Sequence, residues 1–292
     1  MTPDPEPLDA LRQEIDEIDQ EMQALLSKRA EVVERVAQSK SRDNGVHPMR
    51  PGREAILLRK RLDAATDEVP RVVVARIWRE IIASFCRAQG PLTVAVCAPE
   101  KSVGYWDLAR DHFGSATPMS LHKSPQLVVR AVGEGAATVG LLPVPQEDDP
   151  QPWWRYLAGT GPKVPRIIAK LPFCGNPDAR FEDLEALAIA QLEIDESGDD
   201  LSLLVVPASD KMSRASFNGV LRDSGFKGHI VSAYEEGDGL PRLYLAEVAG
   251  LVAAGDPRIG DLVNRLDDQG DGYREGQVFA IGGYARPLGD GD

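Results

Sequence analysis

Basic side chains in the first ninety residues are spaced so that they could bind an anionic ligand. Arg29 and Lys40 lie eleven residues apart in a segment that reads as one continuous helix. At about 100° per residue this separation is roughly 20° past three full turns, so both side chains leave the same face, about 16 Å apart along the axis. Two long cationic side chains in this arrangement could bind opposite ends of a small dianion.

Arg12 has a different relation to this pair. It lies about 25 Å from Arg29 along the same helix axis, which is too far for both to touch one small ligand. If Arg12 serves that ligand, it must come from an antiparallel second copy of the chain. We therefore expect a homodimer that forms through the long N-terminal helix.

Three helices are expected to position these residues. Apolar residues recur every three or four positions over residues 8–40, which predicts one amphipathic helix about 50 Å long. A domain this small cannot bury such a helix alone. The helix therefore needs other helices of the chain, or a second copy of itself, as partners. Shorter helices are expected at 51–65 and 69–88, each with a proline in its first turn. Gly90 and Pro91 end the helical region.

Strands and helices alternate after Pro91, which predicts a parallel α/β lobe. From residue 200 the pattern becomes β-α-β-β-α-β, which is typical of a ferredoxin-like domain. The expected strands of the first lobe are 92–98, 116–122, 136–144 and 163–173, its expected helices are 104–114 and 124–135, and a loop with a short helix is expected over 145–163.

The sequence thus predicts a multidomain chain. An all-α domain is expected over residues 1–90, an α/β lobe over 91–198 and a ferredoxin-like α+β domain over 199–292. The terminal Gly-Asp-Gly-Asp run is expected to fray.

Composition excludes several classes of function. The chain has 292 residues, a formal net charge of −13 and 42% hydrophobic residues, as an ordinary globular protein has. Residues 1–90 are nearly neutral, with 15 Lys and Arg against 16 Asp and Glu, so the remainder carries most of the negative charge. This argues against nucleic acid and anionic lipid as partners. No apolar run is long enough to span a membrane and no signal peptide is evident. The three cysteines suggest neither disulfides nor a metal site, so we expect a reducing cytoplasm.

Residues 8–90 resemble the all-α class of chorismate mutase, an intertwined dimer of three-helix chains. The stretches that carry this resemblance are LDALRQEIDEIDQEMQALLSKRAEVVERVAQSK, RPGREAILLRKRL and VVVARIWREIIASFCRAQG. The resemblance implies that chorismate is the substrate. It also implies that Arg29 and Arg12 of the partner subunit hold the substrate carboxylates, with Arg53 supporting that side of the pocket.

The resemblance also implies a catalytic set. Lys40 and Gln89 would donate hydrogen bonds to the ether oxygen as its bond breaks, and Glu54 would engage the ring hydroxyl. Chorismate rearranges to prephenate through a pericyclic transition state in which negative charge grows on that oxygen. Preorganised donors stabilise this charge, and binding of the reactive conformer supplies orientation. We therefore expect no cofactor and no metal.

Two positions depart from the family pattern. Arg50 lies three residues before Arg53, where the family can have an acidic residue. Phe85 lies four residues before Gln89, where the family often has Ser, and Ser84 comes one place early. Both are supporting positions around the substrate, so they bear on affinity more than on the reaction itself.

The order of the C-terminal regions resembles prephenate dehydratase followed by an ACT domain, to which such mutase domains are often fused. The dehydratase signatures are absent: APEKSVGYW and PVPQEDD stand in two of their places, and Ala179 precedes Arg180-Phe181 where the family has its catalytic Thr. We expect a dehydratase-like remnant without that activity. SRASF and SAYEE replace the effector motifs of phenylalanine-binding ACT domains, so this domain is either structural or an amino-acid sensor of altered specificity.

Simpler interpretations stay open for each residue. A single Arg on an amphipathic helix usually lies on a solvated surface, Glu54 could favour a helix N-terminus electrostatically, and Gln89 could be a polar residue at a helix end. The leading prediction is a chorismate mutase that supplies prephenate for aromatic amino-acid synthesis. The alternative is a non-catalytic, metabolite-binding homologue that regulates a partner.

Overall fold

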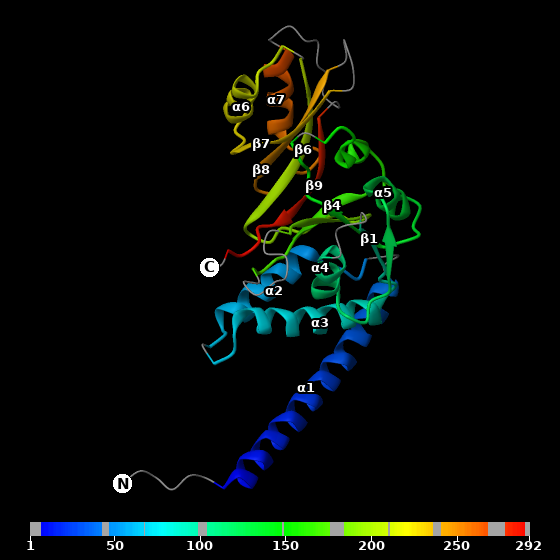
Figure 1. Cartoon of the computed structure of the whole chain (residues 1–292), viewed down its shortest axis with the longest axis vertical. Helices are drawn as coiled ribbons and strands as arrows, with labels where there is room; N and C mark the ends of the chain where they lie inside the picture. Colours follow the sequence, from blue (N-terminus) through cyan, green and yellow to red (C-terminus); the bar gives the residue numbers. More distant parts are fainter. Residues whose placement is uncertain are drawn as a thin grey trace, which may run out of the picture. The chain divides into compact units, whose positions relative to one another are not determined.

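The described residues among the first ninety form three helices, as expected. α1 covers Leu8–Arg42, α2 covers Pro51–Asp63 and α3 covers Arg71–Gln89 (Figure 1). Pro51 lies in the first turn of α2, where its fixed φ suits the helix and its missing N–H would have had no intrahelical partner. The buried residues of α2 recur at the spacing of one helix face: Gly52, Ala55, Leu58 and Leu62.

This computed structural model describes most of the chain. It covers residues 7–42, 47–66, 68–98, 104–147, 149–175, 184–209, 211–235, 241–267 and 278–289, apart from the side chains of 40–42.

The chain forms two compact units. One contains Met1–Pro48 and Phe85–Pro91, and the other contains Met49–Ser84 and Leu92–Asp292. α2 and most of α3 therefore group with the α/β residues. The predicted division at residues 90 and 198 stays a prediction.

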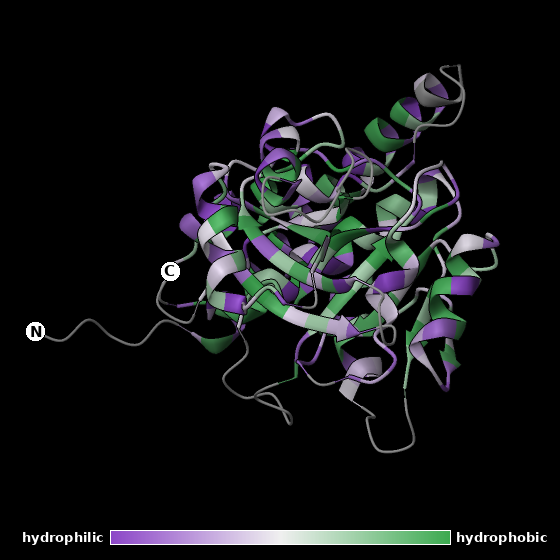
Figure 2. Ribbon diagram, turned by 90° about the horizontal axis from the view of Figure 1, so that it is seen from above, coloured by the Kyte–Doolittle hydropathy of each residue, from purple (hydrophilic) through white to green (hydrophobic). Residues whose placement is uncertain are grey.

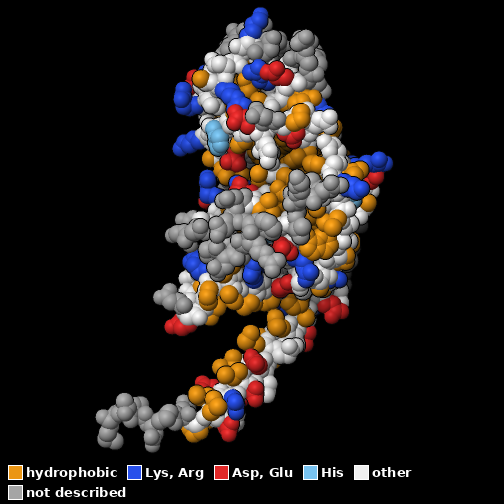
Figure 3. Space-filling model, in the orientation of Figure 1, with side chains coloured by type: hydrophobic (Ala, Val, Ile, Leu, Met, Phe, Trp, Pro, Cys, Tyr) orange, Lys and Arg blue, Asp and Glu red, His pale blue; other side chains and the backbone are white. Residues whose placement is uncertain are grey.

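In the first unit, α1 leaves its apolar stripe uncovered. Leu8, Ile15, Ile18, Met22 and Leu25 are each more than half exposed, and Figure 3 shows hydrophobic side chains along this helix. A stripe of this kind on an amphipathic helix normally packs against another surface. Within the part of the chain that the structure describes, these five side chains are left without such a surface.

In the second unit, the described strands form one nine-stranded sheet in the order β2-β1-β3-β5-β4-β9-β6-β8-β7. The strands are β1 (Val94–Cys97), β2 (Met119–His122), β3 (Val139–Pro143), β4 (Arg166–Leu171), β5 (Ala186–Ala190), β6 (Asp200–Ala208), β7 (Gly228–Glu235), β8 (Arg242–Ala249) and β9 (Phe279–Ala285). The helices among them are α4 (Gly104–Phe113), α5 (Pro125–Gly133), the 3₁₀ helix η1 (Trp153–Leu157), α6 (Arg214–Asp223) and α7 (Pro257–Asp267).

The prediction of a purely parallel lobe is wrong. β1 pairs in parallel with β2 and with β3, but β5 runs antiparallel between β3 and β4. β5 was not predicted from the sequence. The segment has only five residues, ALAIA, and three of them are alanine, which has a low strand propensity. The lobe is therefore a mixed sheet.

The ferredoxin-like arrangement of the last region is confirmed. Its strands lie in the order β9-β6-β8-β7, and all neighbours are antiparallel. These strands are not a separate sheet, however, because β9 also pairs with β4 at Ile167 and Gly282. One sheet thus continues from the α/β lobe into the ferredoxin-like region.

β6 separates two hydrophobic cores, because successive strand residues point to opposite faces. Leu203 and Val205 belong to a core that also contains Trp154, and Leu204 and Val206 belong to a core formed with α6 and α7. Figure 2 shows the hydrophobic strands at the centre of this unit and polar positions on the helices that cover them. Every residue of β6 except Leu201 is buried, which explains the unbroken apolar run at residues 203–208.

Candidate active site

Arg12 lies on the exposed surface of α1. Its Nη1 is 3.2 Å from Oδ1 of Asp9, one turn earlier, and both side chains are mostly exposed. An exposed pair of this kind contributes little to stability. Arg12 is exposed, and its contact with a ligand bound by a second copy stays a prediction.

Arg29 is held against an aromatic ring. Its guanidinium carbon lies 4.3 Å from the ring centroid of Phe85, a cation–π distance. Its Nη1 is buried and has no hydrogen-bond partner among the described residues, and burial lowers the pKa of Arg29 from its ordinary value. Leaving a buried charged donor unsatisfied is costly, and an anionic ligand would relieve that cost.

Gln89 lies beside the same aromatic residue. Its Nε2 donates to the backbone oxygen of Phe85 at 3.0 Å. Phe85, which departs from the family pattern, thus contacts both Arg29 and Gln89. Its ring supports the guanidinium of Arg29.

Lys40 belongs to α1, but its side chain lies outside the described residues. Its position on the same helix face as Arg29 follows from the continuous helix and stays a prediction for the side chain. Residues 99–103 and 176–183, which bear on the missing dehydratase signatures, also lie outside the described part of the chain.

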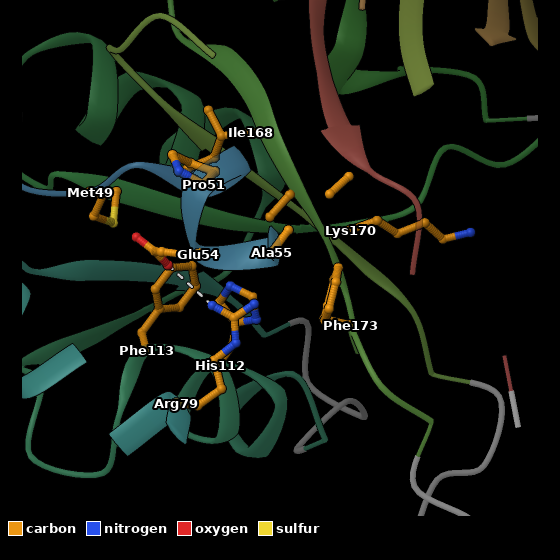
Figure 4. A pocket seen from close by; sticks show the side chains of 12 residues that line it. Met49, Pro51, Glu54, Ala55, Arg79, His112, Phe113, Ile168, Lys170 and Phe173 are labelled. Carbon is orange, nitrogen blue, oxygen red and sulfur yellow. Dashed lines mark hydrogen bonds and ion pairs between the residues drawn. The ribbon is translucent and has the colours of Figure 1, made fainter. Parts of the chain in front are cut away.

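Glu54 is anchored in the first turn of α2, in the second unit. Its Oε1 accepts from the backbone N–H of Arg50 at 3.1 Å, and its Oε2 accepts from Nη1 of Arg79 at 3.1 Å (Figure 4). The Arg79 and Glu54 side chains are only 8% and 16% exposed. The first contact satisfies a free N–H at the helix start, as the simpler interpretation of Glu54 expects. Arg53, the next residue toward the N-terminus, is exposed.

A hollow lies beside this ion pair (Figure 4). It is small and partly open to solvent, and it lies between α2, α3, α4, β4 and β9. Phe113 and Phe173 supply aromatic walls, and His112 and Lys170 add basic groups to Glu54 and Arg79. Nζ of Lys170 forms an ion pair with Oε1 of Glu185 at 2.8 Å. Arg79 was not predicted as a site residue, although its spacing from the buried Ala75 and Ile82 places it on the buried face of α3.

His112 should make the fold sensitive to acid. Burial, and then the charge of Arg79, lower its pKa well below the ordinary value of 6.5. As the pH falls below about 6.5 the unfolded chain therefore takes up this proton first, and the free energy of unfolding should decline by up to about 1.4 kcal/mol per pH unit. Above that pH the contribution should be constant.

Urea denaturation at pH 7.5 and pH 5.5 measures this effect in the wild type and in His112→Gln. The variant should lose less stability between the two pH values than the wild type does. Equal losses in both proteins would show that His112 does not carry the effect.

The structure groups the predicted residues in two sets. In the first unit Arg29 contacts the ring of Phe85 and Gln89 its backbone oxygen, and in the second unit Arg53 and Glu54 begin α2. One pocket that contains both sets stays a prediction.

Residues 11–90 match the family model of chorismate mutase type II. This match covers the three-helix N-terminal region and less than a third of the chain. This agrees with the resemblance found in the sequence.

Curated relatives extend the match beyond this domain. The chain is 34% identical over 145 residues to a bifunctional chorismate mutase/prephenate dehydratase of Pseudomonas aeruginosa, covering 48% of this chain and 40% of the relative. It is 30% identical over 146 residues to the protein of that description in Aquifex aeolicus, covering 48% and 39%. The matched region thus spans about two fifths of these relatives. A prephenate dehydratase structure from Streptococcus mutans aligns with a TM-score of 0.43 at 12% identity, covering 68% of this chain and all of that one.

Proposed function

We propose that the protein is a chorismate mutase that converts chorismate to prephenate. The observation that carries this proposal is Arg29, whose buried Nη1 has no partner among the described residues while its guanidinium is held over Phe85. Such a group is ready to bind a carboxylate with a charge-assisted hydrogen bond. Because residues 11–90 match chorismate mutase type II, we propose chorismate, a dianion, as the ligand of this group.

In this proposal the residues act by position and charge. Arg12 of the partner subunit and Arg29 bind the two carboxylates, and Arg53 supports that side of the pocket. Together they hold the substrate with its reacting ends close together. Lys40 and Gln89 donate hydrogen bonds to the ether oxygen, on which negative charge grows as the C–O bond breaks and the new C–C bond forms. Glu54 engages the ring hydroxyl. No proton has to be transferred in this rearrangement.

The proposal needs two copies of the chain. Arg12 and Arg29 lie about 25 Å apart on one straight helix, so one chain cannot present both to one small ligand. The exposed apolar stripe of α1 supplies a surface that an antiparallel second copy could cover. We therefore include a homodimer through α1 in the proposed function.

Loss of chorismate absorbance with the purified full chain tests the proposal. Brief acid treatment converts prephenate to phenylpyruvate, so its absorbance after acid identifies the product. Turnover well above the uncatalysed rate supports the proposal. A rate of turnover equal to that of a protein-free control would contradict the proposal.

The C-terminal region has a structural or regulatory role in this proposal, with an amino acid as the effector if it senses one. We predict that the protein forms no phenylpyruvate from prephenate at neutral pH, because Ala179 stands where the dehydratase family has its catalytic Thr. The measurement is phenylpyruvate absorbance with prephenate as the substrate and no acid. Formation above background would show that the region is a working dehydratase.

A second candidate function is a non-catalytic metabolite-binding protein. The observation in its favour is that both carboxylate oxygens of Glu54 already have partners, in Arg50 and Arg79. In that case chorismate or prephenate would bind, as calorimetry can detect, without being converted.

A further inference from the structure

The start of α2 is attached to the segment that links β5 to β6. Arg50, at the N-cap of α2, pairs with Asp195 through two contacts: Nη2 donates to Oδ1 at 2.8 Å, and Nε donates to Oδ2. A two-point pair between a guanidinium and a carboxylate fixes direction as well as distance. This explains the presence of Arg50 at a position where the mutase family can have an acidic residue.

The backbones also meet at this point. A Cβ atom built on Gly52 would lie 2.1 Å from the backbone oxygen of Asp195, which no side chain can tolerate. Only glycine therefore permits this approach of α2 to the linking segment. The contact is close packing and does not depend on the Arg50 pair alone.

Arg59 attaches α2 at a second place, two turns along the helix. Its Nη1 donates to the backbone oxygen and to the hydroxyl of Ser197, both at 3.0 Å. Its Nη2 donates to the backbone oxygens of Asp199 and Arg286 at 3.0 and 3.1 Å. Two attachment points along one helix fix both its axis and its rotation about that axis.

The receiving segment is itself rigidly held. The carboxylate of Asp200 accepts from the backbone N–H of Ser197 at 2.8 Å and from its hydroxyl at 2.6 Å. Asp200 begins β6, which pairs with β9 on one side and with β8 on the other. α2 is thus attached to a fixed part of the α/β region.

We propose that Asp195 and Arg50 are positioning residues for the mutase reaction: the α/β region orients the first turn of α2, and with it Arg53 and Glu54, toward the substrate. This inference rests on the proposed function. It assigns the C-terminal region a direct part in the mutase site, so the helical region alone would be a poor mutase.

The test uses Asp195→Asn in the full chain, because Asn keeps the shape and removes the charge. We expect kcat/KM for chorismate to fall about tenfold or more, since small displacements of orienting groups lower rates strongly. The circular dichroism spectrum and Tm should stay close to wild type. The reversed pair, Arg50→Asp with Asp195→Arg, should recover part of the loss, as coupled residues do in a double-mutant cycle.

The matched control is Asp111→Asn. It breaks the pair of Arg76 with Asp111, which joins α3 to α4 at 2.9 Å and is similarly exposed, but which does not touch α2. We expect its kcat/KM to stay within twofold of wild type. An Asp195→Asn protein with wild-type kcat/KM, or with a loss that Asp111→Asn reproduces, would overturn the inference while the proposed function stands. A wild-type protein without turnover would remove both.

Discussion

Lys40→Ala is expected to lower kcat/KM for chorismate about 100- to 1000-fold. The pericyclic transition state places negative charge on the ether oxygen, and removing one preorganised donor to such an oxygen costs about 3 kcal/mol. Because Lys40 is one of the last residues of α1, its loss should not disturb the helix. Steady-state turnover with the purified variant measures this effect.

Lys28→Ala is the matched control for Lys40→Ala. Lys28 is an exposed lysine of the same helix to which no role is assigned. Its removal should leave kcat/KM within about twofold, since surface substitutions rarely matter. If both variants lose activity equally, or if neither does, Lys40 does not donate to the reacting oxygen.

The second large effect concerns the junction of the sheet. We expect Gly282→Ala to lower the free energy of unfolding by about 3 to 5 kcal/mol. Gly282 has φ +131°, and a Cβ there would lie 2.3 Å from the backbone N and O of Ile167. Ile167 and Gly282 are the pair that joins β4 to β9, so this change forces apart the two halves of the sheet. Urea denaturation measures the loss.

Gly135→Ala separates strain from crowding. Gly135 also has a positive φ, +76°, but a Cβ there would meet no atom of the described residues within 4 Å. The free energy of unfolding of this variant should fall by only about 1 kcal/mol, which is the cost of the strained backbone. A Gly282→Ala protein that loses no more than Gly135→Ala would show that the close approach at Ile167 does not stabilise the junction.

The helices and most of the strands were predictable from the sequence, because each shows its own hydrophobic period. Local signals do not reveal which strands pair. β5 looks like a short alanine-rich segment, and its place between β3 and β4 depends on contacts with strands far along the chain. The continuous sheet depends in the same way on the approach of Gly282 to Ile167.

The candidate site, too, was only partly predictable from the sequence. The spacing of basic residues on the first helix indicated an anion site, but the ring beneath Arg29 could not be derived from spacing, because Phe85 comes from another helix. Arg79 was missed as the partner of Glu54, and Asp195 as the partner of Arg50, since 25 and 145 residues separate these pairs. Both partners are groups that only the folded chain brings within hydrogen-bond distance.

The most direct test of the account mixes two inactive proteins. Arg12→Ala and Arg29→Ala chains are unfolded together, refolded and assayed with chorismate. If each pocket takes Arg29 from one copy and Arg12 from the other, half of the dimers are mixed and each has one intact pocket of two, so activity should return to about a quarter of wild type. Activity no higher than the mean of the two separate variants would contradict a pocket shared between two chains.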